Sequence, residues 1–117
     1  MGENEITAGE DRTRLTLSAK RLGDDITVFI YNENAHIGAV AVGEYDHNEK
    51  RTSTSVITRP GHKDDAIALK AAYLISKKTK GPSCVIAGIH LDDITGPEIE
   101  EFLKTADSLV EEFLSLL

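Results

Sequence analysis

The chain has 117 residues, of which 40% are apolar and 28% are charged, so it fits one domain with a modest core. Its formal net charge of −7 argues against general nucleic-acid binding, which needs a basic face. The single cysteine, Cys84, excludes an intramolecular disulfide. No apolar stretch approaches the ~18 residues of a membrane span, and the acidic start of the chain does not resemble a signal peptide, so we expect a cytoplasmic protein.

The first half of the chain has the pattern of short strands joined by turns. Residues 1–11 are polar and are expected to form a flexible tail, which leaves residues 12–117 as a single domain. Four segments either alternate between apolar and polar residues or are rich in β-branched residues, as strands are. They are residues 15–20, 26–31, 36–42 and 52–58. Polar turn residues separate them, so an antiparallel meander is predicted.

The second half of the chain alternates between helix and strand. Apolar residues at helical spacing predict a helix over about residues 63–78, which Gly81-Pro82 ends. The continuous apolar run of residues 84–89 predicts a strand covered on both faces. Thr95 and Glu98 have the spacing of a capping box, and the last helix follows them. Its apolar stripe consists of Ile99, Phe102, Leu103, Ala106, Leu109, Val110 and Phe113.

These elements predict an α/β protein of the two-layer α+β type, with the order β-β-β-β-α-β-α. We expect a mixed, mainly antiparallel five-stranded sheet with two helices packed on one face. The fourth strand, the first helix and the fifth strand can form one right-handed crossover. The other face is then open to solvent or buried in an oligomer. An apolar tail that exceeds the needs of one stripe favours self-association; it comprises Leu114, Leu116 and Leu117.

Polar residues gather at the ends of three predicted strands, and each cluster contains one histidine, namely His36, His62 or His90. In the first cluster, His36 precedes Gly38. A glycine within a strand often marks the close approach of a ligand or of another backbone. Tight packing under a helix is the alternative explanation of Gly38, and the sequence leaves both open.

The second cluster runs from a strand through Gly61 into a helix. Free backbone N–H groups at a helix start attract anions, and Arg59 and Lys63 add positive charge there. Ser55 adds a hydroxyl group, so a phosphate or a carboxylate would fit. The alternative is a capped helix with a solvated charge cluster. The two aspartates at residues 64–65 favour it, because they already satisfy the helix dipole and would repel an anion.

The third cluster ends the buried strand with His90 and continues with the carboxylates Asp92 and Asp93. In parallel α/β units, ligands collect outside the carboxyl ends of strands, where the second and third clusters both lie. The alternative is a helix entry with acidic residues near the dipole.

Two kinds of reactive site are alternatives to a ligand pocket formed by these clusters. Three histidines and an aspartate would suit zinc, but no pair of them has the close spacing of a recognisable ligand set, so no metal is predicted. A triad of Ser55, His62 and Asp92 lacks the sequence of a nucleophile elbow. No catalytic residue is therefore assigned.

Taken together, the three clusters resemble the LpdD-like family. The matching blocks are residues 36–41 (HIGAVA), 53–65 (STSVITRPGHKDD) and 87–94 (AGIHLDDI), in this order, and the resemblance covers about residues 13–104. LpdD-like proteins are described as prenylated-flavin chaperones. They accompany UbiD-type, prenylated-FMN-dependent aromatic acid decarboxylases such as gallate decarboxylase. Their fold is similar to that of the homodimeric proteasome assembly chaperones.

The resemblance implies a non-catalytic, cytoplasmic homodimer, or a higher homo-oligomer, that binds prenylated FMN or FMN and hands it to a UbiD-type decarboxylase. The helix start with Arg59 would hold the phosphate, and Gly38 would let the flat ring approach. Polar side chains from the first and third clusters would contact the edges of the ring or the ribityl chain. The predicted cofactor-binding residues are His36, Gly38, Ser55, Arg59, Gly61, His62, Lys63, His90 and Asp92.

No aromatic residue falls inside the three blocks, so they offer no stacking platform for a flavin. The ring is left to lie against aliphatic residues or across a subunit boundary. Two other functions stay open from the sequence. One is a protein-assembly chaperone without a small-molecule ligand. The other is a small enzyme that uses His62 or His90 as an acid or a base.

Overall fold

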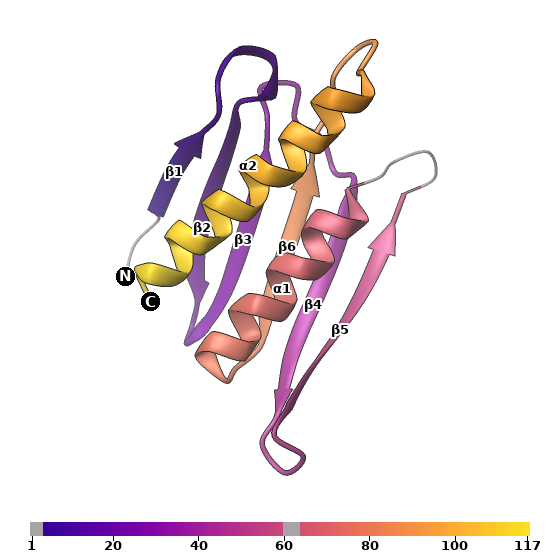
Figure 1. The fold of residues 1–117 in the computed structure, drawn as a ribbon. Coiled ribbons are helices and arrows are strands. Elements are labelled where there is room, and N and C mark those ends of the chain that lie inside the picture. Colours follow the sequence, from indigo (N-terminus) through magenta and orange to yellow (C-terminus); the bar gives the residue numbers. More distant parts are fainter. Residues whose placement is uncertain (1–3, 60–63) are drawn as a thin grey trace.

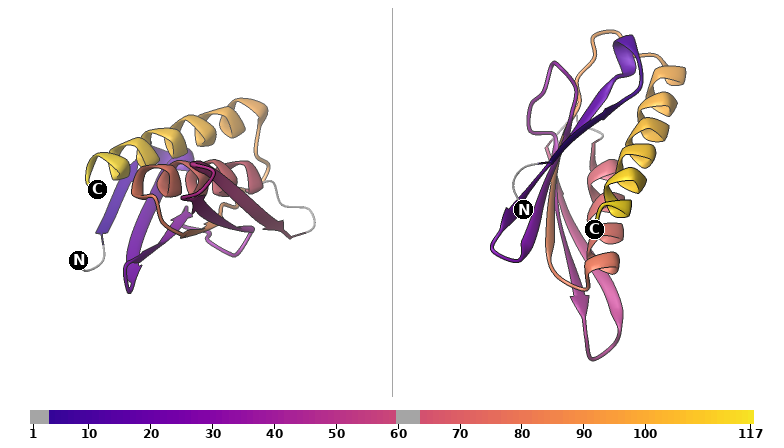
Figure 2. Two further views of the ribbon diagram at one scale, coloured as in Figure 1. Left: turned by 90° about the horizontal axis from the view of Figure 1, so that it is seen from below. Right: turned by 90° about the vertical axis from the view of Figure 1, so that its left-hand side faces the viewer.

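Six strands form one sheet and two helices cover one of its faces, as the computed structural model of the chain shows (Figure 1, Figure 2). The structure describes residues 4–59 and 64–117. The predicted mixed sheet with two helices on one face is confirmed. The elements are β1 (Asn4–Ala8), the short 3-10 turn η1 (Asp11–Thr13), β2 (Leu15–Leu22), β3 (Asp25–Tyr31), β4 (Ala39–Asp46), β5 (Arg51–Thr58), α1 (Asp65–Thr79), β6 (Ser83–Gly88) and α2 (Gly96–Ser115).

The strand order is β1-β2-β3-β6-β4-β5, so the predicted meander of the first four strands is wrong at one point. Strand β6 lies between β3 and β4, parallel to β3 and antiparallel to β4. All other neighbours are antiparallel. The physical reason is burial: β6 is the continuous apolar run, and such a strand is most stable in the middle of the sheet, where both of its faces are covered.

The prediction of five strands is also wrong by one, because residues 4–8 form β1. This strand pairs with β2 along its whole length, and its Ile6 lies opposite Leu17. Ile6 and Ala8 pack against the core beneath α2. Only these two apolar residues mark the strand in the sequence, which is too short an alternation to distinguish it from a polar tail.

The core lies between the sheet and the helices and follows the alternation of the strands. On β2 and β3, every second residue is buried under the helices, including Leu17, Val28 and Ile30. Gly43 on β4 lets α1 approach closely, since a Cβ there would lie 2.5 Å from the carbonyl oxygen of Ala72. Buried hydroxyl groups between α1 and β6 satisfy one another, with 2.8 Å between the Oγ atoms of Ser76 and Ser83.

The predicted capping box at the start of α2 is confirmed. The Thr95 hydroxyl oxygen accepts from the Glu98 N–H at 3.3 Å, and the Glu98 carboxylate accepts from the Thr95 N–H at 3.0 Å. The Arg12 guanidinium donates to the same carboxylate at 2.8 Å. That bond, with the bond from Thr95, lowers the pKa of Glu98 to about 2. These contacts fasten the turn before β2 to the helix.

Three strand ends meet at one edge of the sheet. Strands β3 and β6 are parallel, and β5 runs the same way because both β5 and β6 are antiparallel to β4. Their carboxyl ends therefore share the edge at which β4 and both helices begin, at the top of the sheet in Figure 1. The predicted clusters around His36 and His90 follow β3 and β6 and lie at this edge.

Candidate functional site

The clusters around His36 and His90 are brought into contact. The two imidazole rings meet edge to face, with centroids 5.7 Å apart and an interplanar angle of 61°. His90 Nε2 lies 2.9 Å from Asp92 Oδ1, and this pair is exposed. Because Asp92 accepts, His90 Nε2 carries the hydrogen in this pair. Three of the predicted site residues therefore form one chain of contacts.

Asn32, which the sequence analysis did not single out, holds this arrangement in place. Its side chain is buried and donates through Nδ2 to the backbone oxygen of His90 at 2.7 Å. Its Oδ1 accepts from the backbone N–H of His90 at 3.2 Å. The amide thus clamps the end of β6 to the end of β3. In the sequence, the signal for this role is only an Asn directly after a predicted strand; its burial becomes visible in the structure.

Gly88 lets the loop between β3 and β4 lie directly on β6. A Cβ at residue 88 would lie 2.6 Å from the carbonyl carbon of His36 and closer still to its oxygen. Only glycine fits beneath a peptide group at this distance. The loop, with His36 and Ile37, therefore stands on the face of the sheet that carries no helix, which is called the open face below. It forms one wall of a pocket there.

This pocket is the candidate functional site. Its volume is about 470 Å³, within the range of about 300–1,000 Å³ that is usual for small-molecule sites. Phe29 and Tyr31 of β3 and Ile86 of β6 supply apolar surface from the sheet. The lining residues are Ser18, Phe29, Ile30, Tyr31, Ala35, His36, Ile37, Ile86 and Gly88. Both ring nitrogens of His36 are buried beside it.

The aromatic surface that the three blocks lack thus comes from β3. Phe29 and Tyr31 alternate with the buried Val28 and Ile30, so they point to the open face. The sequence indicates that both faces of this strand are covered, because residues 26–31 are apolar or aromatic at nearly every position. A strand with one solvent-exposed face would alternate between apolar and polar residues. The three blocks lie at or near strand ends, whereas Phe29 and Tyr31 belong to β3 itself, outside all three blocks.

Gly38 and Arg59 lie on the far side of the same loop. The Gly38 N–H donates to the oxygen of Ala87 at 2.9 Å, and the Gly38 oxygen accepts from the Arg59 N–H at 3.0 Å. A Cβ on Gly38 would lie 2.7 Å from the carboxylate carbon of the buried Asp64. The chain's own carboxylate therefore makes the close approach there. The Arg59 guanidinium donates to the oxygen of Ile37 at 2.7 Å, which places its charge against the pocket wall.

The other predicted site residues stand apart or lie outside the described part of the chain. Ser55 is exposed on β5, opposite Val42 of β4, and does not line the pocket. The predicted anion seat at Gly61, His62 and Lys63 lies outside residues 4–59 and 64–117.

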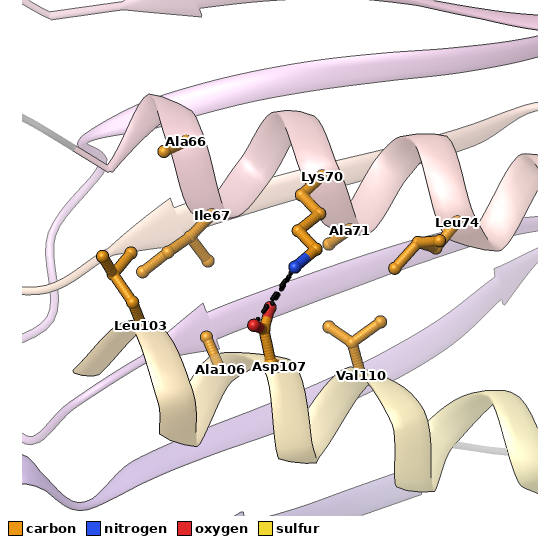
Figure 3. A pocket seen from close by; sticks show the side chains of 9 residues that line it. All are labelled: Ala66, Ile67, Lys70, Ala71, Leu74, Leu103, Ala106, Asp107 and Val110. Atoms are coloured by element: carbon orange, nitrogen blue, oxygen red, sulfur yellow. Dashed lines mark hydrogen bonds and ion pairs between the residues drawn. The ribbon is translucent and has the colours of Figure 1, made fainter. Parts of the chain in front are cut away.

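Other hollows lie beside the pocket and elsewhere on the molecule, and two of them bear on function. A polar cleft of about 740 Å³ shares Tyr31 with the pocket and is lined by Arg12, Arg14 and several carboxylates. A groove of about 190 Å³ lies between α1 and α2, where Lys70 reaches Asp107 at 3.0 Å over apolar side chains (Figure 3). It is too small for a cofactor and has no convergent polar groups.

Within the part of the chain that the structure describes, no three His, Cys, Asp or Glu side chains gather as a metal site requires. None of the described helices is long and apolar enough to cross a membrane. Of the three hollows described above, the pocket beside His36 is the one that combines the size of a small-molecule site, an apolar lining and a few polar groups.

Comparisons with known proteins agree with the resemblance noted in the sequence. The family model described as "Prenylated flavin chaperone LpdD-like domain" matches residues 9–117. A search of curated proteins finds no match. Among solved structures, a chain from "Crystal Structure of a Novel Chaperone Complex for Yeast 20S Proteasome Assembly" has a similar fold. Its TM-score is 0.62 at 16% sequence identity, and the alignment covers 99% of this chain and 95% of that chain.

Proposed function

The chain belongs to the prenylated flavin chaperone LpdD-like family, and we propose that it binds prenylated FMN, or FMN, in the pocket on the open face without chemically changing it. The observation that carries this proposal is the pocket itself. It combines the volume of a small-molecule site with the side chains of Phe29, Tyr31 and Ile86. A flat, mostly apolar ring system gains most from such a surface, because stacking and apolar burial act together.

The polar end of the flavin lies, in this proposal, at the rim of the pocket. His36 lines the pocket, and its ring contact with His90 sets its position beside the polar edge of the ring. Arg59, held against Ile37, supplies the charge for the phosphate at the strand end that leads to residues 61–63. Asp92 orients His90 in turn. Gly38 contributes through the path of the loop, because its N–H and its oxygen tie the loop to Ala87 and Arg59, and Ser55 does not line the pocket.

The partner in this proposal is a UbiD-type decarboxylase, to which the protein delivers the cofactor in the cytoplasm. The pocket is open at one side, as a site that must release its ligand to another protein needs to be. We also propose that the protein is a homodimer. Exposed apolar side chains on the open face support this, notably Ile37, Val42 and Ile57, of which Ile57 is 76% exposed.

Anaerobic titration with oxidised FMN, reduced FMN and prenylated FMN tests the proposed ligand. We expect at least one of them to bind with a shifted absorption or quenched fluorescence. The variant Phe29→Ala should then weaken binding at least about tenfold, because it removes one of the two aromatic side chains of β3 that line the pocket. Thr27→Ala is the matched control, since Thr27 lies on the same face of β3 but does not line the pocket. Failure of all three flavins to bind would refute the proposal.

A protein-assembly chaperone without a small-molecule ligand is the second candidate. It is favoured by apolar side chains of the helices that remain exposed, namely Leu69 and Tyr73 on α1 and Leu103 on α2, of which Leu103 lines the groove of Figure 3. A protein partner that docks there would be lost on Leu103→Glu, whereas flavin binding would not change. Co-purification that depends on Leu103 and not on Phe29 would select this candidate.

A further inference from the structure

The open face carries a continuous apolar stripe that runs across four strands. The register places Phe29 of β3 beside Ile86 of β6, Ile86 beside Val40 of β4, and Val40 beside Ile57 of β5. These four side chains are called the apolar stripe below. Ile57 is 76% exposed, and the other three are half-buried. A sheet face that stays in water normally carries polar side chains, so the stripe indicates a surface that is covered in the working protein.

We infer that a second copy of this chain covers the apolar stripe and closes the flavin pocket. The inference rests on the proposed flavin site for its second part only. The stripe is complementary to itself about a two-fold axis that runs parallel to the strands, between β6 and β4. Such an axis sets Phe29 against Ile57 of the second copy and Ile86 against its Val40. Each contact occurs twice, as in any isologous dimer.

The neighbouring row of the open face fits the same axis. This row lies two residues along each strand from the apolar stripe, on the side away from the pocket. It consists of Thr27, Cys84, Val42 and Ser55, side by side in register. The axis sets Thr27 against Ser55 of the second copy and Cys84 against its Val42, so hydroxyl groups meet hydroxyl groups and apolar groups meet apolar groups. Two sheets packed in this way lie about 10 Å apart with their strands nearly aligned.

The second copy also completes the pocket. Phe29 and Ile86 belong both to the stripe and to the pocket lining. Strand β5 of the second copy would lie over Phe29, at the open side of the pocket. A bound ring would then be enclosed between two subunits and shielded from water, which strengthens each polar contact at its rim. In one chain alone, the site lacks this cover.

A competing dimer would join the free edges of two β5 strands. The Arg59 N–H bonds to the Gly38 oxygen, so odd-numbered residues of β5 point their backbone groups toward β4. The N–H of Thr54 consequently points outward, along the free edge. Thr54→Pro blocks pairing at that edge and leaves the β4–β5 ladder intact. This variant separates the two dimers.

Sedimentation of the purified protein gives the first test. We expect wild type and Thr54→Pro to be dimers. Ile57→Glu should raise the dimer dissociation constant at least about 30-fold, as the loss of a central interface residue does. Ile57→Val, the matched control, should stay dimeric. Phe29→Lys should be monomeric alone but should form a mixed dimer with Ile57→Glu, because one Phe–Ile contact is kept and the other becomes Lys–Glu. Circular dichroism confirms that each variant is folded.

Three results would overturn the assignment of the surface: a monomeric wild type at about 100 µM, an Ile57→Glu variant that stays dimeric, or a monomeric Thr54→Pro variant. FMN titration tests the closure of the pocket. Ile57 does not line the pocket, yet Ile57→Glu should weaken FMN binding at least about tenfold. Unchanged affinity in this monomer would overturn the closure. A dimeric wild type that binds no flavin would instead refute the proposed function and leave the dimer surface standing.

Discussion

Gly88→Ala should damage the candidate site from beneath. The added Cβ would lie 2.6 Å from the carbonyl carbon of His36, and Cβ contacts essentially never fall below 3.0 Å. The peptide group of His36 must therefore leave β6. The bond from the Gly38 N–H to the Ala87 oxygen, 2.9 Å long, lies beside this contact and would stretch with it. The loop that forms the pocket wall would detach from the sheet.

The expected cost has two parts. Overpacking against backbone costs about 1–3 kcal/mol, and loss of the loop hydrogen bond adds about 1 kcal/mol. Urea unfolding should therefore show a loss of about 2–4 kcal/mol with an unchanged m-value. Flavin affinity should fall at least about tenfold at a temperature where the variant is folded, because His36 and Ile37 move away from the ring.

Two control variants separate the local effect from a general loss of stability. Gly43→Ala places a Cβ 2.5 Å from the Ala72 oxygen, on the helix side of the sheet, so it should lower stability without changing flavin affinity. Gly96→Ala meets nothing within 4 Å and should change neither. A Gly88→Ala protein with wild-type stability and wild-type affinity would refute the account of the loop.

Three more predictions follow from the contacts around the site. Asn32→Ala removes both side-chain bonds to the backbone after β6 and should cost about 1–3 kcal/mol in thermal unfolding, whereas a change at the exposed Asn34 should cost little; equal effects would contradict the clamp. Because Arg12 lowers the pKa of Glu98 from 4.5 to about 2, the stability from this pair is fully present above pH 4.5 and is lost as the pH falls toward 2. Glu98→Gln should flatten that part of the stability profile in urea unfolding, and an unchanged profile would contradict it. Arg59→Ala should weaken FMN at least about threefold and leave riboflavin unchanged, since riboflavin lacks the phosphate; equal losses would place the phosphate elsewhere.

Local patterns were sufficient to predict most elements. The alternation around Leu17 and Val28, the capping box at Thr95 and Glu98, and the helix breaker at Gly81 each act within a few residues, so each is readable along the chain. The position of β6 is different. Its apolar run indicates burial, but the choice of β3 and β4 as neighbours depends on the packing of α1 across the sheet, which no short pattern records.

The candidate site likewise contains residues that local patterns predict and residues that they do not. Strand ends and polar residues pointed to His36 and His90, whose rings do meet. The aromatic lining of the pocket could not be predicted, because Phe29 and Tyr31 look like ordinary strand residues in the sequence. Only the assembled sheet shows that they lie on the face without a helix. Asn32 directly follows the predicted strand of residues 26–31, and only the structure shows that its side chain bridges two strands that are distant in sequence. Contacts between distant segments decide such roles.

Mapping the backbone amide resonances during titration with FMN tests the central claim most directly. The account predicts shifts centred on the residues that line the pocket, namely residues 18, 29–31, 35–37, 86 and 88, together with residues of the rim such as Arg59 and His90. The segments 66–74 and 103–110, which contain the residues that line the groove between the helices, should not respond. Shifts centred on that groove, or no shifts at saturating FMN, would contradict a flavin site on the open face.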